Sequence, residues 1–189
     1  MKPAEIPLVG FAAFSGTGKT TLLVKLLGIF NERDLRVAVV KHAHHTFEID
    51  YPGKDSYELR KAGASQVLIG SRKRWALITE NEDMQDKSLQ YHISNLDLSN
   101  LDLVLVEGFK PEVIPKIELH RPSLSKELLF PNDDSIIAIA TDAKVENTNN
   151  LPCLDLNNPQ EIAEFVIDRF LSVPLGAREK VEMEKNHER

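Results

Sequence analysis

Cysteine is almost absent from this chain, because only Cys153 occurs among its 189 residues. A single cysteine excludes an internal disulfide and any cysteine-rich metal site. In that setting a cysteine most often behaves as a small hydrophobic residue. We therefore expect Cys153 to be buried.

Long apolar runs are also missing. No stretch reaches the ~18 consecutive apolar residues that a membrane-spanning helix needs. The apolar run that follows residues 1–5 leads into a glycine-rich loop and not into a cleavage site, which is unlike a secretory leader. We expect a cytoplasmic protein that has no membrane partner.

The chain has no excess of positive charge. It carries 23 Lys and Arg against 29 Asp and Glu, for a net charge of −6. A non-specific nucleic-acid binder needs a basic face, so we do not expect a nucleic-acid partner. The same charge balance is compatible with one nucleotide held in a local positive pocket.

What the chain does contain is the tail of a Walker A phosphate loop, between an apolar run at 6–14 and a helical pattern at 19–33. Glycines let backbone amides turn inward around phosphate oxygens, and the helix that follows adds unpaired N–H groups. The strict pattern begins with glycine, where this chain has Ala13. The predicted phosphate-binding residues are Ser15, Gly16, Thr17, Gly18, Lys19, Thr20 and Thr21, with Lys19 on the β- and γ-phosphates and the Thr20 hydroxyl on Mg²⁺.

The periodicity indicates an α/β fold with a mostly parallel central sheet flanked by helices, of the P-loop NTPase type. Two apolar strands, 6–14 and 36–40, enclose the helix and form one right-handed βαβ unit of parallel strands. Two short strands joined by a basic turn predict a small hairpin excursion. One domain is expected over 1–171, followed by a charged, disordered tail over 172–189. Further strands are expected at 66–70, 75–79, 101–107, 116–120, 135–140 and 151–156, and further helices at 55–63, 89–96 and 158–171.

Two acids compete for the magnesium role of a Walker B strand. Asp102 begins the apolar run and Glu107 ends it, so at ~3.3 Å per residue they lie about 16 Å apart. Ligands of open α/β sheets collect at the carboxyl ends of the strands. Glu107 is therefore the candidate for binding Mg²⁺ or orienting water.

Polar residues after the second strand leave several interpretations open. The histidines His42, His44 and His45 indicate a metal site, a loop that faces phosphate or substrate, or a solvated loop. Asp50 lies near the expected rim of the site and is a candidate for Mg²⁺ or for positioning water.

The segment after the strand at 135–140 is the candidate base-recognition loop. A carboxylate at Asp142 can accept hydrogen bonds from guanine N1–H and the 2-amino group, which adenine lacks in that arrangement. The usual guanine motif, Asn-Lys-x-Asp, does not occur here. A surface turn is the alternative explanation for Asp142.

Taken together, these motifs resemble the molybdopterin-guanine dinucleotide biosynthesis adapter family, MobB. The pairing of Lys-His-Ala-His-His with Pro-Gly-Lys-Asp-Ser is far more specific than a phosphate loop alone. The resemblance covers about residues 6–171. The segments that carry it are 14–21, 41–45, 52–56, 60–64 and 105–110.

The resemblance implies a P-loop GTPase that binds GTP with Mg²⁺, hydrolyses it slowly and forms homodimers. It implies an adapter that assists the molybdenum cofactor guanylyltransferase, which attaches GMP to molybdopterin. Carried over by position, residues 15–21 hold phosphates, while Thr20 and Glu107 serve Mg²⁺. Phe14 stands where many relatives of the wider class have a lysine, so a lysine supplied in trans is not expected.

The expected chemistry is attack of water on the γ-phosphate, with Lys19 and the loop amides stabilising the developing charge. Two other functions fit the same motifs. A small-molecule kinase would use a basic lid, for which the turn at 72–74 is a candidate. A non-catalytic carrier would present molybdopterin or a nucleotide to a partner, with the histidine loop as its ligand face.

Overall fold

The computed structural model describes residues 6–43, 47–81 and 85–172. The chain divides into two compact units, a larger one formed by residues 1–42 and 89–189 and a smaller one formed by residues 43–88. Most of the tail expected at 172–189 lies outside the described residues, as do His44 and His45.

Among the described residues of the larger unit, six strands form one sheet in the order β2-β5-β1-β6-β7-β8. Every neighbouring pair in this sheet is parallel, which confirms the predicted α/β class. The strands are β1 (Leu8–Ala13), β2 (Val37–Lys41), β5 (Leu103–Glu107), β6 (Lys116–His120), β7 (Ile136–Thr141) and β8 (Cys153–Asp155).

The position of β5 decides which residues meet. The predicted parallel relation of β1 and β2 is correct, but the two strands do not touch, because β5 pairs with both of them. Leu105 of β5 is opposite Val9 on one side and Val39 on the other. This insertion places Glu107, at the carboxyl end of β5, beside both Lys41 and the strand that leads into the phosphate loop.

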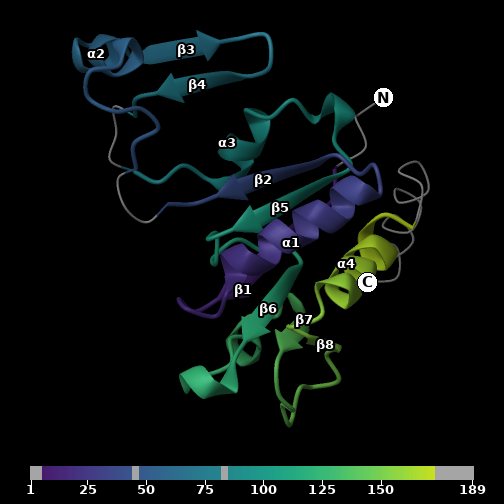
Figure 1. The fold of residues 1–189 in the computed structure, drawn as a ribbon. Coiled ribbons are helices and arrows are strands. Elements are labelled where there is room, and N and C mark those ends of the chain that lie inside the picture. The colour runs from purple at the N-terminus through teal and green to yellow at the C-terminus, as the bar shows by residue number, and fades with distance from the viewer. Residues whose placement is uncertain (1–5, 44–46, 82–84, 173–189) are drawn as a thin grey trace, which may run out of the picture. The chain divides into compact units, whose positions relative to one another are not determined.

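Helices cover both faces of this sheet. Figure 1 shows α1 (Lys19–Glu32) and α4 (Pro159–Phe170) side by side over one face. Their buried side chains join one core with Leu103 and Leu105. On the opposite face, α3 (Leu89–Ser94) packs against Val104 and Val106. Successive side chains of β5 therefore point to opposite faces of the sheet and pack into two separate hydrophobic cores. This is the pattern of a strand that is buried on both faces.

The segment after β6 is held by a buried carboxylate. Glu118 accepts hydrogen bonds from the backbone N–H groups of Leu129 (2.7 Å) and Phe130 (2.9 Å). Burial of Glu118 raises the pKa of its carboxyl, because the ionised form loses its water. Two short 3₁₀ turns, Pro122–Leu124 and Phe130–Asn132, fold this segment back onto β7.

The smaller unit consists of a short helix and a hairpin. The helix is α2 (Asp55–Lys61), and the hairpin is β3 (Gln66–Gly70) with β4 (Trp75–Thr79), paired antiparallel. Both strands coincide with the ranges predicted from sequence. Within the described residues this two-stranded sheet pairs with no further strand.

Cys153 does not behave as predicted. It lies on β8, the last strand of the sheet order, and its side chain is exposed. Side chains of β8 alternate between its two faces, and Leu154 takes the side that faces the core, so Cys153 lies on the uncovered side. In the part of the chain that the structure describes, none of the helices has the length and apolar character needed to span a membrane.

Candidate functional site

The phosphate loop has the backbone geometry that its glycines predict. Gly16 has a φ of 85° and Gly18 a φ of 96°, in the left-handed region that favours glycine. No heavy atom lies within 4 Å of the position that a Cβ of Gly16 would occupy, so this part of the loop faces open space. The Thr17 hydroxyl donates to the Phe14 carbonyl oxygen at 2.7 Å and closes the loop.

The helix that follows the loop begins in the way an anion site requires. Lys19 is the first residue of α1, and within the described residues no side chain caps the N-terminus of α1. No acidic residue occupies the first turn. Among the described residues, neither a capping side chain nor an acid of the first turn therefore neutralises the partial positive charge of the helix end. Ser15, Gly16, Thr20 and Thr21 are all exposed at this end.

Two lysines converge on the predicted Walker B carboxylate. The Lys19 Nζ lies 3.5 Å from Glu107 Oε1, and the Lys41 Nζ lies 3.7 Å from the same oxygen. Glu107 is nearly buried, while the Lys41 side chain is 57% exposed. The structure thus brings the predicted residues Lys19 and Glu107 together and adds Lys41, whose role sequence reasoning did not recognise.

Gly108 is required for a reason that the sequence did not reveal. Its φ is 92°, and an added Cβ would lie 2.9 Å from the His42 carbonyl oxygen. The His42 backbone N–H in turn donates to the Glu107 carbonyl oxygen at 2.8 Å. The space beside Gly108 is thus filled by the backbone that follows β2, and this close contact fixes the position of Glu107.

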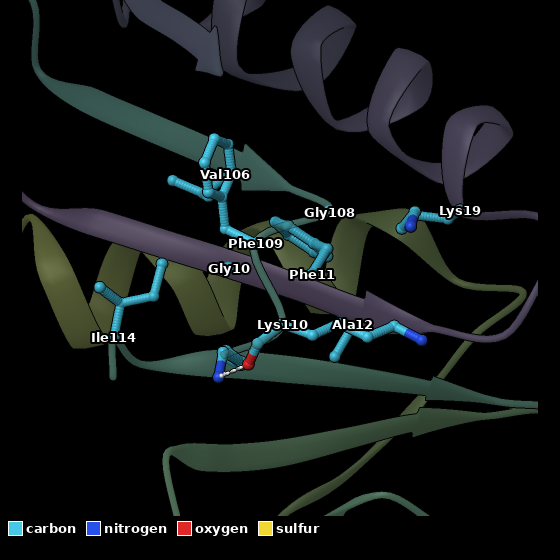
Figure 2. Close-up of a pocket in the computed structure, with 10 residues that line it drawn as sticks. Gly10, Phe11, Ala12, Lys19, Val106, Gly108, Phe109, Lys110 and Ile114 are labelled. Atoms are coloured by element: carbon cyan, nitrogen blue, oxygen red, sulfur yellow. Dashed lines mark hydrogen bonds between the residues drawn. The ribbon is translucent and has the colours of Figure 1, made fainter. Parts of the chain in front are cut away.

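A small pocket lies next to the loop (Figure 2). It is lined by Phe11, Phe109, Lys19 and Lys110 among others, from β1, the start of α1 and the segment after β5. Its lining combines aromatic side chains with lysines.

The ring of Phe14 is flanked by cations. The Lys110 Nζ lies 5.2 Å from the ring centroid and the Lys126 Nζ lies 5.9 Å from it. Two lysines of the same chain thus bring positive charge to the position of Phe14.

Arg121 is the main residue that sequence reasoning missed. It follows β6 directly, and its Nε donates to the Thr17 carbonyl oxygen of the phosphate loop at 2.9 Å. Its Nη1 pairs with Asp142 Oδ2 at 2.5 Å. The predicted base-recognition residue Asp142 is thereby connected to the loop. The available signal was a basic residue directly after a strand, because ligands collect at the carboxyl ends of strands.

Asp50 lies in the smaller unit, where a structural role is visible. Its Oδ1 accepts from Arg60 Nη2 at 2.8 Å, and Arg60 also pairs with Glu48 and Glu80. The hydrogen bond from Arg60 lowers the pKa of the Asp50 carboxyl. This pairing therefore stabilises the unit above the ordinary carboxyl pKa and is lost as the pH falls. The proposed Mg²⁺ role of Asp50 stays a prediction.

Two residues of the larger unit carry oxygen atoms that could serve as ligands of Mg²⁺. Among the described residues there is no group of three or more His, Cys, Asp and Glu side chains that could hold a metal ion. Mg²⁺ is commonly bound by one or two protein oxygens together with substrate phosphates and water. Glu107 at the end of β5 and the Thr20 hydroxyl in the first turn of α1 supply oxygens of that kind.

Comparison with known proteins gives a consistent result. Residues 8–142 match the protein-family model described as "Molybdopterin guanine dinucleotide synthesis protein B". Over 169 residues the chain is 48% identical to the molybdopterin-guanine dinucleotide biosynthesis adapter protein of Escherichia coli (strain K12), covering 86% of this chain and 93% of that protein. It is 45% identical over 175 residues to the adapter protein of the same name from Haemophilus influenzae, covering 92% of this chain and 94% of that protein.

Comparison with solved structures points to the same family. The fold matches the crystal structure of a molybdopterin-guanine biosynthesis protein B with a TM-score of 0.66 and 27% sequence identity. That match covers 85% of this chain and 98% of the other. The similarity therefore extends over both sequence and fold.

Proposed function

The chain belongs to the molybdopterin guanine dinucleotide synthesis protein B family, and we propose that it is a GTP-binding adapter with weak Mg²⁺-dependent GTPase activity. Its role would be to assist the enzyme that attaches GMP to molybdopterin. The observation that supports this most is the approach of Lys19 to Glu107 at the start of an uncapped helix.

The chain's own residues account for triphosphate binding. The loop from Ser15 to Gly18 presents backbone amides, and Lys19 adds a full positive charge at the head of α1. Lys19 and these amides would also stabilise charge that develops on the γ-phosphate during hydrolysis. Thr17 is buried and donates a hydrogen bond to the Phe14 carbonyl oxygen, which keeps the loop in this shape.

Mg²⁺, when bound with the nucleotide, would neutralise phosphate charge. Thr20 and Glu107 are the residues that would hold it. Glu107 is suited to the task because the backbone of His42 and Gly108 fixes its position at the end of β5. The same carboxylate could instead orient the attacking water, and both roles require its negative charge.

The test compares Glu107→Gln with the unaltered protein. We expect GTP affinity to change by less than about threefold and phosphate release to fall at least about tenfold, because the amide keeps the shape and loses the charge. Affinity is measured by calorimetry with and without Mg²⁺, and turnover as inorganic phosphate. The control is Glu32→Gln, an exposed acid at the other end of α1. Unchanged turnover in Glu107→Gln would remove Glu107 from the mechanism.

The same assay separates the competing functions. A GTPase passes phosphate to water, whereas a small-molecule kinase would yield a phosphorylated acceptor when acceptors are added. A non-catalytic carrier would bind GTP without releasing phosphate. For the adapter role, addition of the protein should increase the yield of guanylylated molybdopterin in a guanylyltransferase reaction.

We place the homodimer contact on the hairpin of the smaller unit. An isolated two-stranded sheet is marginally stable in water. Here the face formed by Leu68, Trp75 and Leu77 is apolar, and these side chains are 66%, 67% and 45% exposed. Symmetric dimers join identical patches, and a second copy offers a matching apolar face.

Leu77→Lys is therefore expected to convert a dimer into a monomer, because an ammonium would be buried against the partner's apolar face. Sedimentation velocity measures the change. The control is Val24→Lys on the exposed side of α1, which should leave the dimer intact. A monomeric unaltered protein, or a dimeric Leu77→Lys variant, would contradict the placement.

A further inference from the structure

We propose that Arg121 and Asp142 together recognise the guanine base, with the guanidinium on the acceptor side of the base and the carboxylate on its donor side. This inference rests on the proposed GTP binding and adds a residue that the usual guanine motif does not contain. In that motif, Asn-Lys-x-Asp, all the polar groups come from one loop. Here the loop reads Thr141-Asp142-Ala143-Lys144, and the extra cation comes from the neighbouring strand.

Sheet topology places these residues beside the phosphate loop. β6 pairs with β1 on one side and with β7 on the other. Leu119 is opposite Ala13, the last residue before the loop, and His120 is opposite Thr141. Arg121 therefore leaves the sheet between the phosphate loop and the segment that carries Asp142. A nucleotide whose phosphates lie in the loop has its base in reach of this edge of the sheet.

The contacts of Arg121 bridge three segments. Its Nε donates to the Thr17 carbonyl oxygen, its Nη1 pairs with Asp142 Oδ2, and its Nη2 lies 3.5 Å from Asn157 Oδ1. The same Nη2 would be 3.9 Å from a Cβ placed on Gly18. The loop contact fixes the direction of the guanidinium, and the weaker Asn157 contact leaves one end able to exchange partners.

The pair is accessible to a ligand. The Arg121 and Asp142 side chains are 29% and 24% exposed, so neither is sealed in the core. Arg121 uses only Oδ2 of the carboxylate, and Asp142 has a second oxygen that can accept another donor. Arg121 thus holds the ion pair against the phosphate loop, while the exposed part of the pair remains accessible to a ligand.

The positive charge of Arg121 and the negative charge of Asp142 complement the hydrogen-bonding groups of guanine but not those of adenine. Guanine presents O6 and N7 as adjacent acceptors, for which arginine is the commonest partner, and N1–H with the 2-amino group as adjacent donors. A neighbouring guanidinium and carboxylate complement this order of groups. Adenine carries an amino donor at the position of O6, so its N–H groups would face the guanidinium. Adenine would therefore leave both charged groups without a suitable partner.

The test measures discrimination and not affinity alone. For Arg121→Met we expect GTP affinity to fall about 10- to 100-fold while ATP affinity stays within about threefold, because a bidentate base contact is lost. Arg121→Lys should restore part of the preference through a single donor. Competition titrations with GTP and ATP in Mg²⁺ give both constants. The control is Arg169→Met, an exposed arginine in the last turn of α4.

Asp142→Asn tests the other half of the pair. An asparagine amide can donate to the 2-carbonyl of xanthine, so XTP should gain affinity at least about tenfold relative to GTP. This variant keeps the size of the side chain, and it provides a second readout if Arg121→Met does not fold.

Three results would count against the inference. Equal losses for GTP and ATP in Arg121→Met would show that Arg121 only holds the phosphate loop in place, and would overturn its role at the base. An unchanged ratio of XTP to GTP in Asp142→Asn would overturn the role of the carboxylate. If the unaltered protein bound no nucleotide, the proposed function itself would fail, and this inference with it.

Discussion

Replacing Lys19 by alanine is expected to abolish measurable GTP binding, with a loss of at least about 100-fold in affinity. A charged hydrogen-bond donor on a polyphosphate contributes several kcal/mol when it is partly shielded from water, and the Lys19 side chain is only 19% exposed. In the variant, Glu107 would also keep only Lys41 as a cationic neighbour. The unfavourable charge of Glu107 would then act more strongly on the phosphates.

Two matched variants isolate this effect. Lys25→Ala removes the same charge from an exposed position on the same helix, and its affinity for GTP should stay within about twofold. Lys41→Ala removes the more exposed partner of Glu107 and should weaken binding by less than about tenfold. Calorimetric titration in Mg²⁺ measures all three variants. A Lys19→Ala protein that binds GTP as tightly as Lys25→Ala would contradict the phosphate-loop assignment.

Gly108→Ala is expected to lower the free energy of unfolding by about 2–5 kcal/mol. Two costs add at this position, since the residue must keep a φ of 92° and its methyl group would lie 2.9 Å from the His42 carbonyl oxygen. Backbone cannot move aside as a flexible side chain can. Denaturant unfolding in the absence of nucleotide, followed by circular dichroism, measures the change.

Other glycines of the larger unit provide the controls. Gly16→Ala also imposes a positive φ, but no atom lies within 4 Å, so its cost should be only about 1–2 kcal/mol. Gly28→Ala lies in α1 with open space around it and should stabilise the protein by about 0.5–1 kcal/mol. A Gly108→Ala protein as stable as Gly16→Ala would show that the His42 backbone yields without cost.

The local pattern of the sequence predicted most of the fold. The strand, glycine-rich loop and helix at 6–33 agree with β1 and α1, and the hairpin strands agree to the residue. The start of α4 also has the residues that capping rules favour, because the Asn158 side chain accepts a hydrogen bond from the Glu161 N–H and Pro159 is the first residue of the helix. These features depend on neighbours within a few positions of one another, which is why periodicity and capping rules can identify them.

The order of the strands within the sheet could not be predicted from local sequence patterns in the same way. Nothing in the spacing of apolar residues shows that β5 lies between β1 and β2, yet that order brings Lys41 to Glu107. Likewise, no local pattern of the sequence shows that the backbone of His42 fills the space beside Gly108. Strand order results from the packing of whole helices against the sheet, and no local window contains that information.

By itself, the sequence determined that a glycine-rich loop lies between a strand and a helix, because Gly16 and Gly18 are the residue type that positive φ angles favour. It also determined the α/β class, because buried parallel strands need continuous apolar runs. Only the tertiary structure decided that Arg121 contacts both Thr17 and Asp142, since these residues are 104 and 21 positions away from it. Contacts of that separation depend on which strands become neighbours, and this in turn depends on the most favourable packing of the complete core.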